Sequence, residues 1–363
     1  MCSFIISAKG YRKKKGSNEM KKSIKIIALV LSVLFVVAGV VACSEKANFY
    51  SELRKAKGIN QFEYAAEIKI AGGEAAVLAD EAKVKISGVY VDDKNMSMEV
   101  MFTNGSDTYT KLTNVYFIED KVYIDVRSAL DAIKETLGFL ASEFDSELIL
   151  KEGEDYYELS LSDVMGEESS NTDKYSALAK EIANICLDFL EEASLNVSPS
   201  ALTEDNGVYS FEISNKNVQS FVNELGKVLD KEYENTINSI ISKYEGKGEA
   251  EKAIADALKE FKETNNEEII NTIKDMKEYK YEEKDEFNLK ASVSVKGTEG
   301  SRILQLDVVT KTKSEEAGEG TIDLSLTVTE KSVAKLSAPD GVLTEESITN
   351  LSALFSGLFA TTM

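Results

Sequence analysis

Thiols are the most reactive side chains in this sequence, and it has three of them: Cys2, Cys43 and Cys186. Cys186 lies in residues 183–190, where apolar residues recur at helical spacing, so we interpret it as a buried structural thiol. The chain contains no histidine, which excludes Ser–His–Asp and Cys–His catalysis as well as histidine-based zinc sites. Cys2 precedes the segment discussed next and is expected to be absent from the mature chain, so Cys43 is the thiol to which we assign chemistry.

Cys43 ends a segment that has the order of an export signal. Lys21, Lys22 and Lys25 precede a run, residues 26–42, that is apolar except for one serine and one glycine. A basic segment followed by such a run is typical of a secretory signal peptide, and a membrane-spanning anchor is the alternative. The run closes with Val40-Val41-Ala42-Cys43, which resembles the lipobox of bacterial lipoproteins.

This resemblance implies that a diacylglycerol is attached to the Cys43 thiol and that a peptidase removes residues 1–42. Two fatty chains anchor a protein to a membrane without a spanning helix. Met20 gives a signal of ordinary length, so we interpret it as the true start; a long basic extension through residues 1–19 is the alternative. The Lys-, Ile-, Asn- and Glu-rich composition favours the extracytoplasmic face of a Gram-positive cell membrane.

The charge of the chain after residue 42 restricts its partners. Residues 1–42 contain eight Lys or Arg and one acidic residue, so the other 321 residues contain 34 basic and 62 acidic residues, a net charge of −28. Nucleic acids and anionic lipid surfaces bind basic patches, so we expect neither as a broad contact. Carboxylate chemistry such as glycoside hydrolysis stays formally open. No motif indicates it, and we expect no enzyme activity, cofactor or metal.

The elements that must position a binding site come as strands, then helices, then strands, then a helix. Period-two alternation covers residues 62–126 and the three segments from residue 287 to 328, whereas residues 215–281 repeat apolar residues every three or four positions. Shorter patterns predict helices at 127–144 and 174–192 and strands at 156–161 and 208–213. Thr344 is expected to cap a final helix.

We therefore predict an α+β fold in which a curved antiparallel sheet packs against helices. A long helical hairpin, residues 215–281, is inserted between two β-rich segments. The expected organisation is a signal peptide (1–42), a lipidated tether (43–60) with a candidate helix at residues 49–57, an α+β body (61–343) and a C-terminal helix (344–363).

One local pattern resembles the half-barrel lipoproteins, namely the LolA-like periplasmic carriers and the LppX/LprG-like cell-envelope lipoproteins. It is the hairpin Val115-Tyr-Phe-Ile-Glu-Asp-Lys-Val-Tyr-Ile-Asp-Val126 followed by the predicted helix 127–144. The resemblance implies a curved sheet that wraps helices and holds an acyl chain between them. Residues 215–281 depart from that compact pattern.

Other residue patterns have simpler structural interpretations. Ser332-Val-Ala-Lys335 matches the Ser-x-x-Lys of serine acyltransferases but lacks the accompanying motifs. Glu204-Asp205-Asn206-Gly207 is interpreted as a hairpin turn, because the ligand spacing of a calcium loop is missing. Core packing is the preferred interpretation of Met96, Met98 and Met101, with the lining of an adaptable apolar pocket as the alternative. Sheet packing is the interpretation of five tyrosines, and solvated loops that of two acidic pairs. These are Tyr109, Tyr116, Tyr123, Tyr156 and Tyr157, and Glu282-Glu283 and Glu315-Glu316.

Two hypotheses about function follow. The first is a membrane-anchored, non-catalytic module that binds a lipid or another hydrophobic small molecule between sheet and helices. The second is a structural lipoprotein with a solid core that contacts a protein partner whose identity the sequence does not indicate. A cavity lined by strand faces favours the first, and an exposed apolar stripe on residues 215–281 favours the second. Apart from Cys43, no binding residue can be assigned.

Overall fold

The computed structural model describes residues 49–56, 58–72, 81–105, 108–137, 145–160, 172–281, 286–314 and 318–360. All of them belong to one unit of the chain, Ala38–Met363, and the other unit, Met1–Val37, contains no described residue. Cys43 lies outside the described residues, as do both predicted acidic pairs. Among the helices that the structure describes, none is long and apolar enough to cross a membrane.

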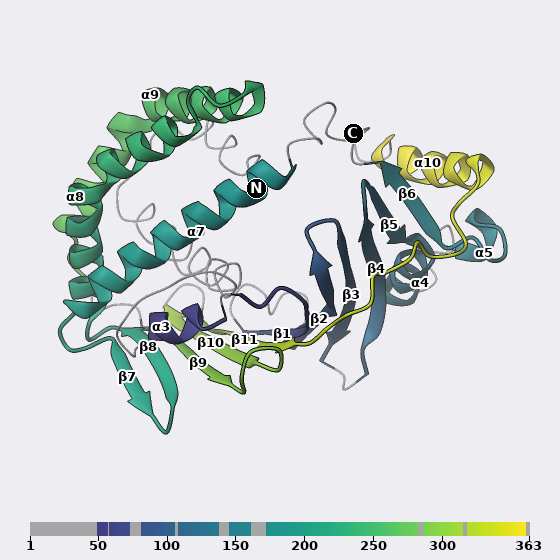
Figure 1. The fold of residues 1–363 in the computed structure, drawn as a ribbon. Helices are drawn as coiled ribbons and strands as arrows, with labels where there is room; N and C mark the ends of the chain where they lie inside the picture. Colours follow the sequence, from purple (N-terminus) through teal and green to yellow (C-terminus); the bar gives the residue numbers. More distant parts are fainter. Residues whose placement is uncertain are drawn as a thin grey trace. The chain divides into compact units, whose positions relative to one another are not determined.

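The described strands form one open antiparallel sheet in the order β6-β5-β4-β3-β2-β1-β11-β10-β9-β8-β7. Figure 1 shows the sheet curving from β7 to β6. The strands are β1 (Phe62–Gly72), β2 (Glu81–Asp92), β3 (Asn95–Asn104), β4 (Thr110–Ile118), β5 (Lys121–Asp125), β6 (Tyr156–Ser160), β7 (Leu202–Asp205), β8 (Val208–Ser214), β9 (Glu286–Lys296), β10 (Ile303–Ser314) and β11 (Gly318–Glu330).

At the centre of the sheet, the first described strand pairs with the last one. β1 pairs with β2, its neighbour in sequence, and also with β11, with Phe62 opposite Tyr90 on one side and opposite Glu330 on the other. The strands β1–β6 follow each other in order on one side of this junction, and β9–β11 do so on the other. The predicted α+β fold with an antiparallel sheet is confirmed.

The described helices are α3 (Phe49–Arg54), α4 (Val126–Leu137), α5 (Ser146–Ile149), α7 (Thr172–Leu195), α8 (Val218–Tyr244), α9 (Glu249–Lys277) and α10 (Glu345–Ala360). They gather at the two ends of the sheet (Figure 1). α3 packs on β7, β8 and β9, and α8 on β8, whereas α4 packs on β4 and β6 and joins α5 and α10 in a second core around Leu130 and Leu351.

Helices α8 and α9 form the predicted hairpin between β8 and β9. Both pack with α7 around Ile240, Tyr244 and Ile254. At the far end of the hairpin, the Asn223 side-chain amide donates to the carbonyl oxygens of Met276, Lys277 and Tyr279, and so satisfies the C-terminus of α9. The crossing is close because Gly226 has no side chain: a Cβ there would lie 2.8 Å from the Lys277 backbone nitrogen.

The segment that we predicted as a tether, residues 43–60, contains packed structure. All six residues of α3 are buried, and the Phe49 and Tyr50 side chains are 0% exposed. Their rings surround Phe211 of β8, with Phe49 and Phe211 centroids 6.0 Å apart. Within the described residues, the packed body therefore begins at Phe49, and the part of the predicted tether before α3 is at most residues 43–48.

The β6 edge and the last helix are joined by a short extended segment. The Gly341 carbonyl accepts from the backbone N–H groups of Asp155 and Tyr156, and the Leu343 N–H donates to the Tyr156 carbonyl. Thr344 precedes α10 as predicted, and its carbonyl accepts from the Ile348 N–H. Its side-chain hydroxyl donates to the Glu154 carboxylate, 3.2 Å away. Residues 341–344 therefore connect the β6 edge to the start of α10.

Candidate ligand-binding face

One face of the sheet is apolar from β8 through to β3, and we call it the apolar face. Its residues follow from alternation and register: residues opposite each other in paired antiparallel strands point to the same side. In β10, Leu304, Leu306 and Val308 lie opposite Val328, Leu326 and Leu324 of β11. The face comprises Tyr209, Phe211 and Ile213; Phe287, Leu289, Ala291, Val293 and Val295; Leu304, Leu306, Val308, Thr310 and Thr312; Gly320, Ile322, Leu324, Leu326, Val328 and Glu330; Phe62, Tyr64, Ala66, Ile68, Ile70 and Gly72; Ala82, Val84, Ile86, Gly88 and Tyr90; and Met96, Met98, Val100, Phe102 and Asn104.

Burial changes along this face. The central apolar side chains of β9, β10 and β11 are buried, whereas those of β1, β2 and β3 remain half-buried. The half-buried set includes Tyr64, Ile68, Ile86, Met98 and Phe102. An incompletely buried apolar surface that spans three strands is larger than the scattered single hydrophobic residues that are normal on proteins, and surfaces of this kind are candidates for contact with another apolar body.

Aromatic rings shape the surface where β1 meets β2. Phe62 and Tyr90 lie opposite each other and stack, with centroids 4.9 Å apart. The neighbouring pair joins Tyr64 to Gly88, and the Tyr64 hydroxyl donates to the Ser97 carbonyl oxygen on β3. A Cβ at Gly88 would lie 2.9 Å from that hydroxyl oxygen, so the absence of a side chain at Gly88 provides the space that the Tyr64 side chain fills.

The opposite face of the same strands is charged. Glu81 pairs with Lys69 and Lys83 at 3.0 and 2.9 Å, and Lys85 pairs with Glu67 at 3.4 Å. The Lys85 ammonium also lies over the Tyr109 ring. This division between the two faces of β1 and β2 is typical of an antiparallel sheet with one solvated face and one face that packs on other apolar groups.

Helix α7 extends along the apolar side of the sheet. Near its C-terminus, the Ser194 and Tyr50 hydroxyls lie 2.8 Å apart, and Tyr50 belongs to α3, which packs on the apolar face at β8. Towards its N-terminus, the Lys180 ammonium lies 3.4 Å from the Asp93 carboxylate in the turn between β2 and β3. Strands are about 4.8 Å apart, so β8 and β2 are about 24 Å apart, and Lys180 to Ser194 covers about 21 Å of helix. These distances are consistent with α7 crossing from β8 towards β2 (Figure 1).

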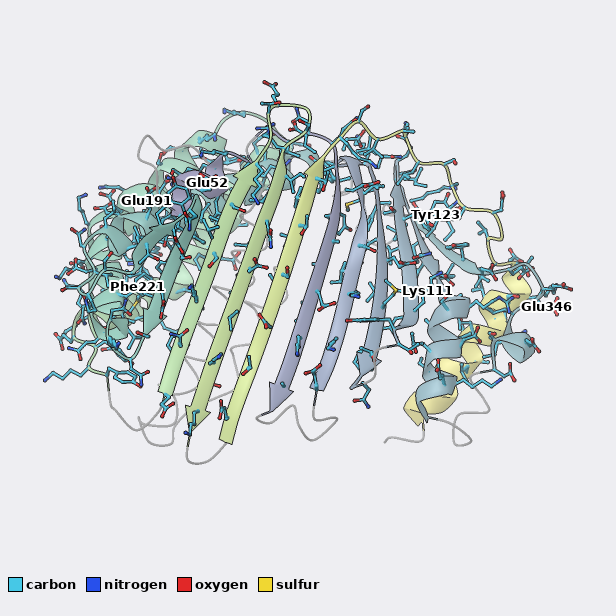
Figure 2. All side chains as sticks on the ribbon, turned by 90° about the horizontal axis from the view of Figure 1, so that it is seen from below. Glu52, Lys111, Tyr123, Glu191, Phe221 and Glu346 are labelled. Atoms are coloured by element: carbon cyan, nitrogen blue, oxygen red, sulfur yellow. The ribbon has the colours of Figure 1, made fainter. Side chains whose placement is uncertain are left out.

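Buried charges fix α3 to α7. The Arg54 guanidinium pairs with Glu191 and Asp188 of α7, while the Glu52 carboxylate accepts from the Val295 backbone N–H on β9. Figure 2 shows Glu52 and Glu191 in the same region of the molecule. Burial raises the pKa of the Asp188 carboxyl and also that of the Tyr50 phenol. The position of α3, and with it the start of the packed chain, is therefore set by paired charges as well as apolar contacts.

A second ion pair closes one end of the apolar face. The Arg302 guanidinium binds both carboxylate oxygens of Glu330, at 2.7 and 2.8 Å. Glu330 also accepts from the backbone N–H groups of Gly300 and Arg302, and Arg302 donates to the Lys55 carbonyl just after α3. Hydrogen bonds from Arg302 lower the pKa of the Glu330 carboxyl to about 2. The pair therefore connects α3, β10 and β11.

Among the hollows that described residues line, the two best defined are not lined by the apolar face. The larger, about 560 Å³, lies between α7 and the α8–α9 turn and is bordered by Ile185, Tyr244 and Lys247. The smaller, about 280 Å³, lies among turn residues including Asn95 and Lys335. Among the described residues, no cluster of three or more His, Cys, Asp or Glu side chains is arranged to hold a metal ion.

Several residues singled out in the sequence now have positions. Cys186 is half-buried on α7, and burial raises the pKa of its thiol, as fits a structural cysteine. Met96 and Met98 lie on the apolar face, but Met101 is paired with Lys85 and points to the charged face. The three methionines therefore do not form one lining. Asn206 and Gly207 have φ values of 52° and 78°, which confirms the predicted hairpin turn.

The remaining motif residues are separated by the fold. Ser332 and Lys335 lie in an extended segment after β11, so their spacing does not place them on one helix face, and Lys335 pairs with Glu119. Among the tyrosines, Tyr116 and Tyr156 pack edge to face with centroids 5.9 Å apart. Tyr157 packs instead against the second core near Leu130. The site that the sequence did not indicate is the apolar face itself, because it depends on strand register.

Comparison with known proteins gives no family assignment: no protein-family model matches the sequence, and no curated protein is significantly similar to it.

Proposed function

We propose that this protein is a membrane-anchored, extracytoplasmic lipoprotein that binds a lipid or similar hydrophobic ligand on the apolar face. Cys43 would carry the diacylglycerol anchor at the outer face of the cytoplasmic membrane. The observation that carries the proposal is the half-buried apolar surface of β1, β2 and β3, which continues the buried surface of β9, β10 and β11. No catalytic constellation is part of the proposal.

The position of α7 supports the binding of a ligand on the apolar face. A helix that crosses the apolar side of the sheet from β8 towards β2 provides a second wall for an elongated apolar molecule. Binding sites for hydrophobic ligands commonly remove most of the ligand surface from water by enclosing it between such walls. The half-barrel lipoproteins to which residues 115–144 bear a resemblance hold acyl chains between a curved sheet and helices.

The proposed anchor also places the body close to the membrane. Five residues separate Cys43 from Phe49, the first residue of the buried helix α3. Even when the chain is fully extended, the six Cα-to-Cα steps from Cys43 to Phe49 reach only about 22 Å. The apolar face would therefore lie within one protein diameter of the lipid surface, which suits a protein that exchanges a hydrophobic molecule with the membrane.

Native mass spectrometry of residues 44–363, purified from bacteria without detergent, tests the binding proposal. We expect a co-purified lipid that organic extraction removes. The adjacent residues Ala66 and Ala65 offer a matched pair of variants, because Ala66 lies opposite Ile86 and Leu326 on the apolar face while Ala65 lies opposite Ser87 and Thr327 on the other. Ala66→Glu should lose the lipid and Ala65→Glu should keep it, with far-UV circular dichroism checking that both variants fold.

Ligand-free protein in every preparation would contradict the proposal, as would equal lipid content in the two variants. The structural alternative, a solid body that contacts a protein partner, predicted an exposed apolar stripe on residues 215–281. Within that range, Ile270, at 51% exposed, is the one large hydrophobic residue on the exposed surface. The hairpin surface therefore gives no specific support to the alternative.

A further inference from the structure

The hollow of about 560 Å³ between α7 and the turn that joins α8 to α9 has the features of a binding site. Unlike the buried centre of the apolar face, this hollow is open to solvent, so a ligand has room to enter it. Ala177, Ile185 and Tyr244 form its apolar part, and three lysines, two glutamates and an asparagine line the remainder. Small-molecule sites usually combine an apolar lining with a few charged or polar groups in this way.

The charge of this hollow differs from that of the protein as a whole. Residues 43–363 contain 34 basic and 62 acidic residues, yet the three lysines of the hollow outnumber its two glutamates. The Lys243 ammonium lies 2.7 Å from the Glu181 carboxylate, and this hydrogen bond raises the pKa of Lys243. Lys247 is exposed, and within the described part of the chain no carboxylate pairs with it. A bound anion would therefore balance a charge that the protein leaves open.

Lys180 connects the hollow to the apolar face. It lines the hollow, and its ammonium lies 3.4 Å from the carboxylate of Asp93 in the turn that joins β2 to β3. Asp93 is three residues from Tyr90 and three from Met96, which both belong to the apolar face, so about 10 Å of chain separates it from that surface. One molecule can thus place a charged end in the hollow and an apolar tail along β2 and β3.

The size and charge of the hollow restrict the chemistry of its ligand. Lysine ammonium groups act as point charges that bind oxyanions, above all phosphate groups. A volume of about 560 Å³ lies within the range of about 300–1,000 Å³ that is typical of sites for small organic molecules, and it exceeds the need of a single phosphate ion. The hollow therefore fits a phosphate that is part of a larger head group.

We propose that this hollow binds the anionic phosphate head group of a lipid whose acyl chains lie on the half-buried apolar surface of β1, β2 and β3, and that Lys180 and Lys247 supply the positive charge. This inference rests on the proposed function and makes it more specific, because it names the charge class of the lipid and the residues that recognise it. It predicts a preference for anionic over zwitterionic phospholipids. A soluble phosphate ester is the other source of the same chemistry.

The experiment uses delipidated residues 44–363, which include every described residue. Calorimetry measures the affinities for dioctanoyl phosphatidylglycerol, dioctanoyl phosphatidylcholine and glycerol 3-phosphate, with both lipids kept below their micelle concentrations. The two lipids share the phosphate and the chains and differ in net charge, whereas glycerol 3-phosphate has no chains. The test variant is Lys180→Gln/Lys247→Gln. The matched control is Lys252→Gln/Lys274→Gln, which removes the same charge from exposed positions of α9 outside the hollow.

We expect the unchanged protein and the control variant to bind the anionic lipid roughly four- to twenty-five-fold more tightly than the zwitterionic lipid, because each partly exposed ammonium group contributes about two- to fivefold. In the test variant, the two affinities should differ by less than about twofold. Circular dichroism should show the same fold and melting temperature for all three proteins, since the replaced lysines are exposed.

Equal binding of the two lipids by the unchanged protein overturns the inference, as does a preference that survives in the test variant or disappears in the control. Glycerol 3-phosphate should bind far more weakly than the anionic lipid, and equal affinity would overturn the assignment of the hollow to a lipid. If neither lipid binds the unchanged protein, the proposed function itself fails.

Discussion

Replacing Glu330 by glutamine should show how much the Arg302–Glu330 pair contributes to stability. The substitution retains the size of the side chain but removes the charge that binds Arg302 and two backbone N–H groups. A carboxyl pKa lowered from 4.5 to about 2 corresponds to about 3 kcal/mol of folding free energy at neutral pH. The Glu330 side chain is 9% exposed, so solvent screening reduces this value modestly, and we expect a loss of about 2 kcal/mol.

The stability that the Glu330 carboxylate contributes should decrease as the pH falls. Because the pKa of Glu330 is lower in the folded protein than in the unfolded chain, its contribution is complete above about pH 5 and falls as the pH drops from 4.5 towards 2. Urea unfolding of residues 44–363 at pH 7, 5, 4 and 3, followed by circular dichroism, measures the difference between Glu330→Gln and the unchanged protein. At pH 3 the difference should fall to less than half of its value at pH 7.

The ion pair formed by the next residue of the chain, Lys331, provides a matched control. Glu63 pairs with Lys331 on the surface, where both side chains are about half exposed, so Glu63→Gln should cost less than 1 kcal/mol at any of these pH values. If Glu330→Gln costs no more than this control, or if its cost does not change between pH 7 and pH 3, the reasoning about the ion pair is wrong.

Three further predictions concern the anchor, the hairpin and the buried charges. Cys43→Ala should abolish labelling with clickable palmitate, whereas Cys186→Ala should retain it; a labelled Cys43→Ala protein would remove the proposed anchor. Gly226→Ala should destabilise the protein by about 1–3 kcal/mol in urea, because the new Cβ would lie 2.8 Å from the Lys277 nitrogen; unchanged stability would show that the helices separate easily. Arg54→Met should cost about 3 kcal/mol at pH 7 because it removes the cation beside the buried Glu191 carboxylate, whereas Lys243→Met, at an exposed pair with Glu181, should cost less than 1 kcal/mol.

Much of the fold could be predicted because each element carries its own local pattern. The alternation of Met96, Met98, Val100 and Phe102 predicts β3, and the three- and four-residue repeats of residues 215–281 predict the hairpin that α8 and α9 form. Boundaries were less certain: the predicted helix at 127–144 is observed as Val126–Leu137, and residues 138–144 lie outside the described set.

The relations between distant elements were not predictable in the same way. Nothing in residues 49–54 indicates that Arg54 pairs with Glu191, 137 residues away, or that the whole helix is buried. A helix at residues 49–57 was expected within the tether, but its polar residues gave no sign of burial, since charged residues are usually exposed unless they find partners. The apolar face also depends on relations between distant elements. Each strand supplies a few alternating residues, and only the register between strands makes them one surface.

The junction of β1 with β11 has a consequence for how the protein is made. Phe62 and Glu330 are paired in the sheet but are 268 residues apart in the sequence, so this contact has a very high contact order. If the chain crosses the membrane amino-terminus first, as the proposed signal peptide implies, β1–β6 can pair before β11 has emerged, and β1 then remains an open edge with free backbone groups. Open edges of this kind attract other strands and promote aggregation. Pairing of β11 with β1 would therefore be a late and slow step, and under the proposed anchoring the chain would need protection at the membrane until that step is complete.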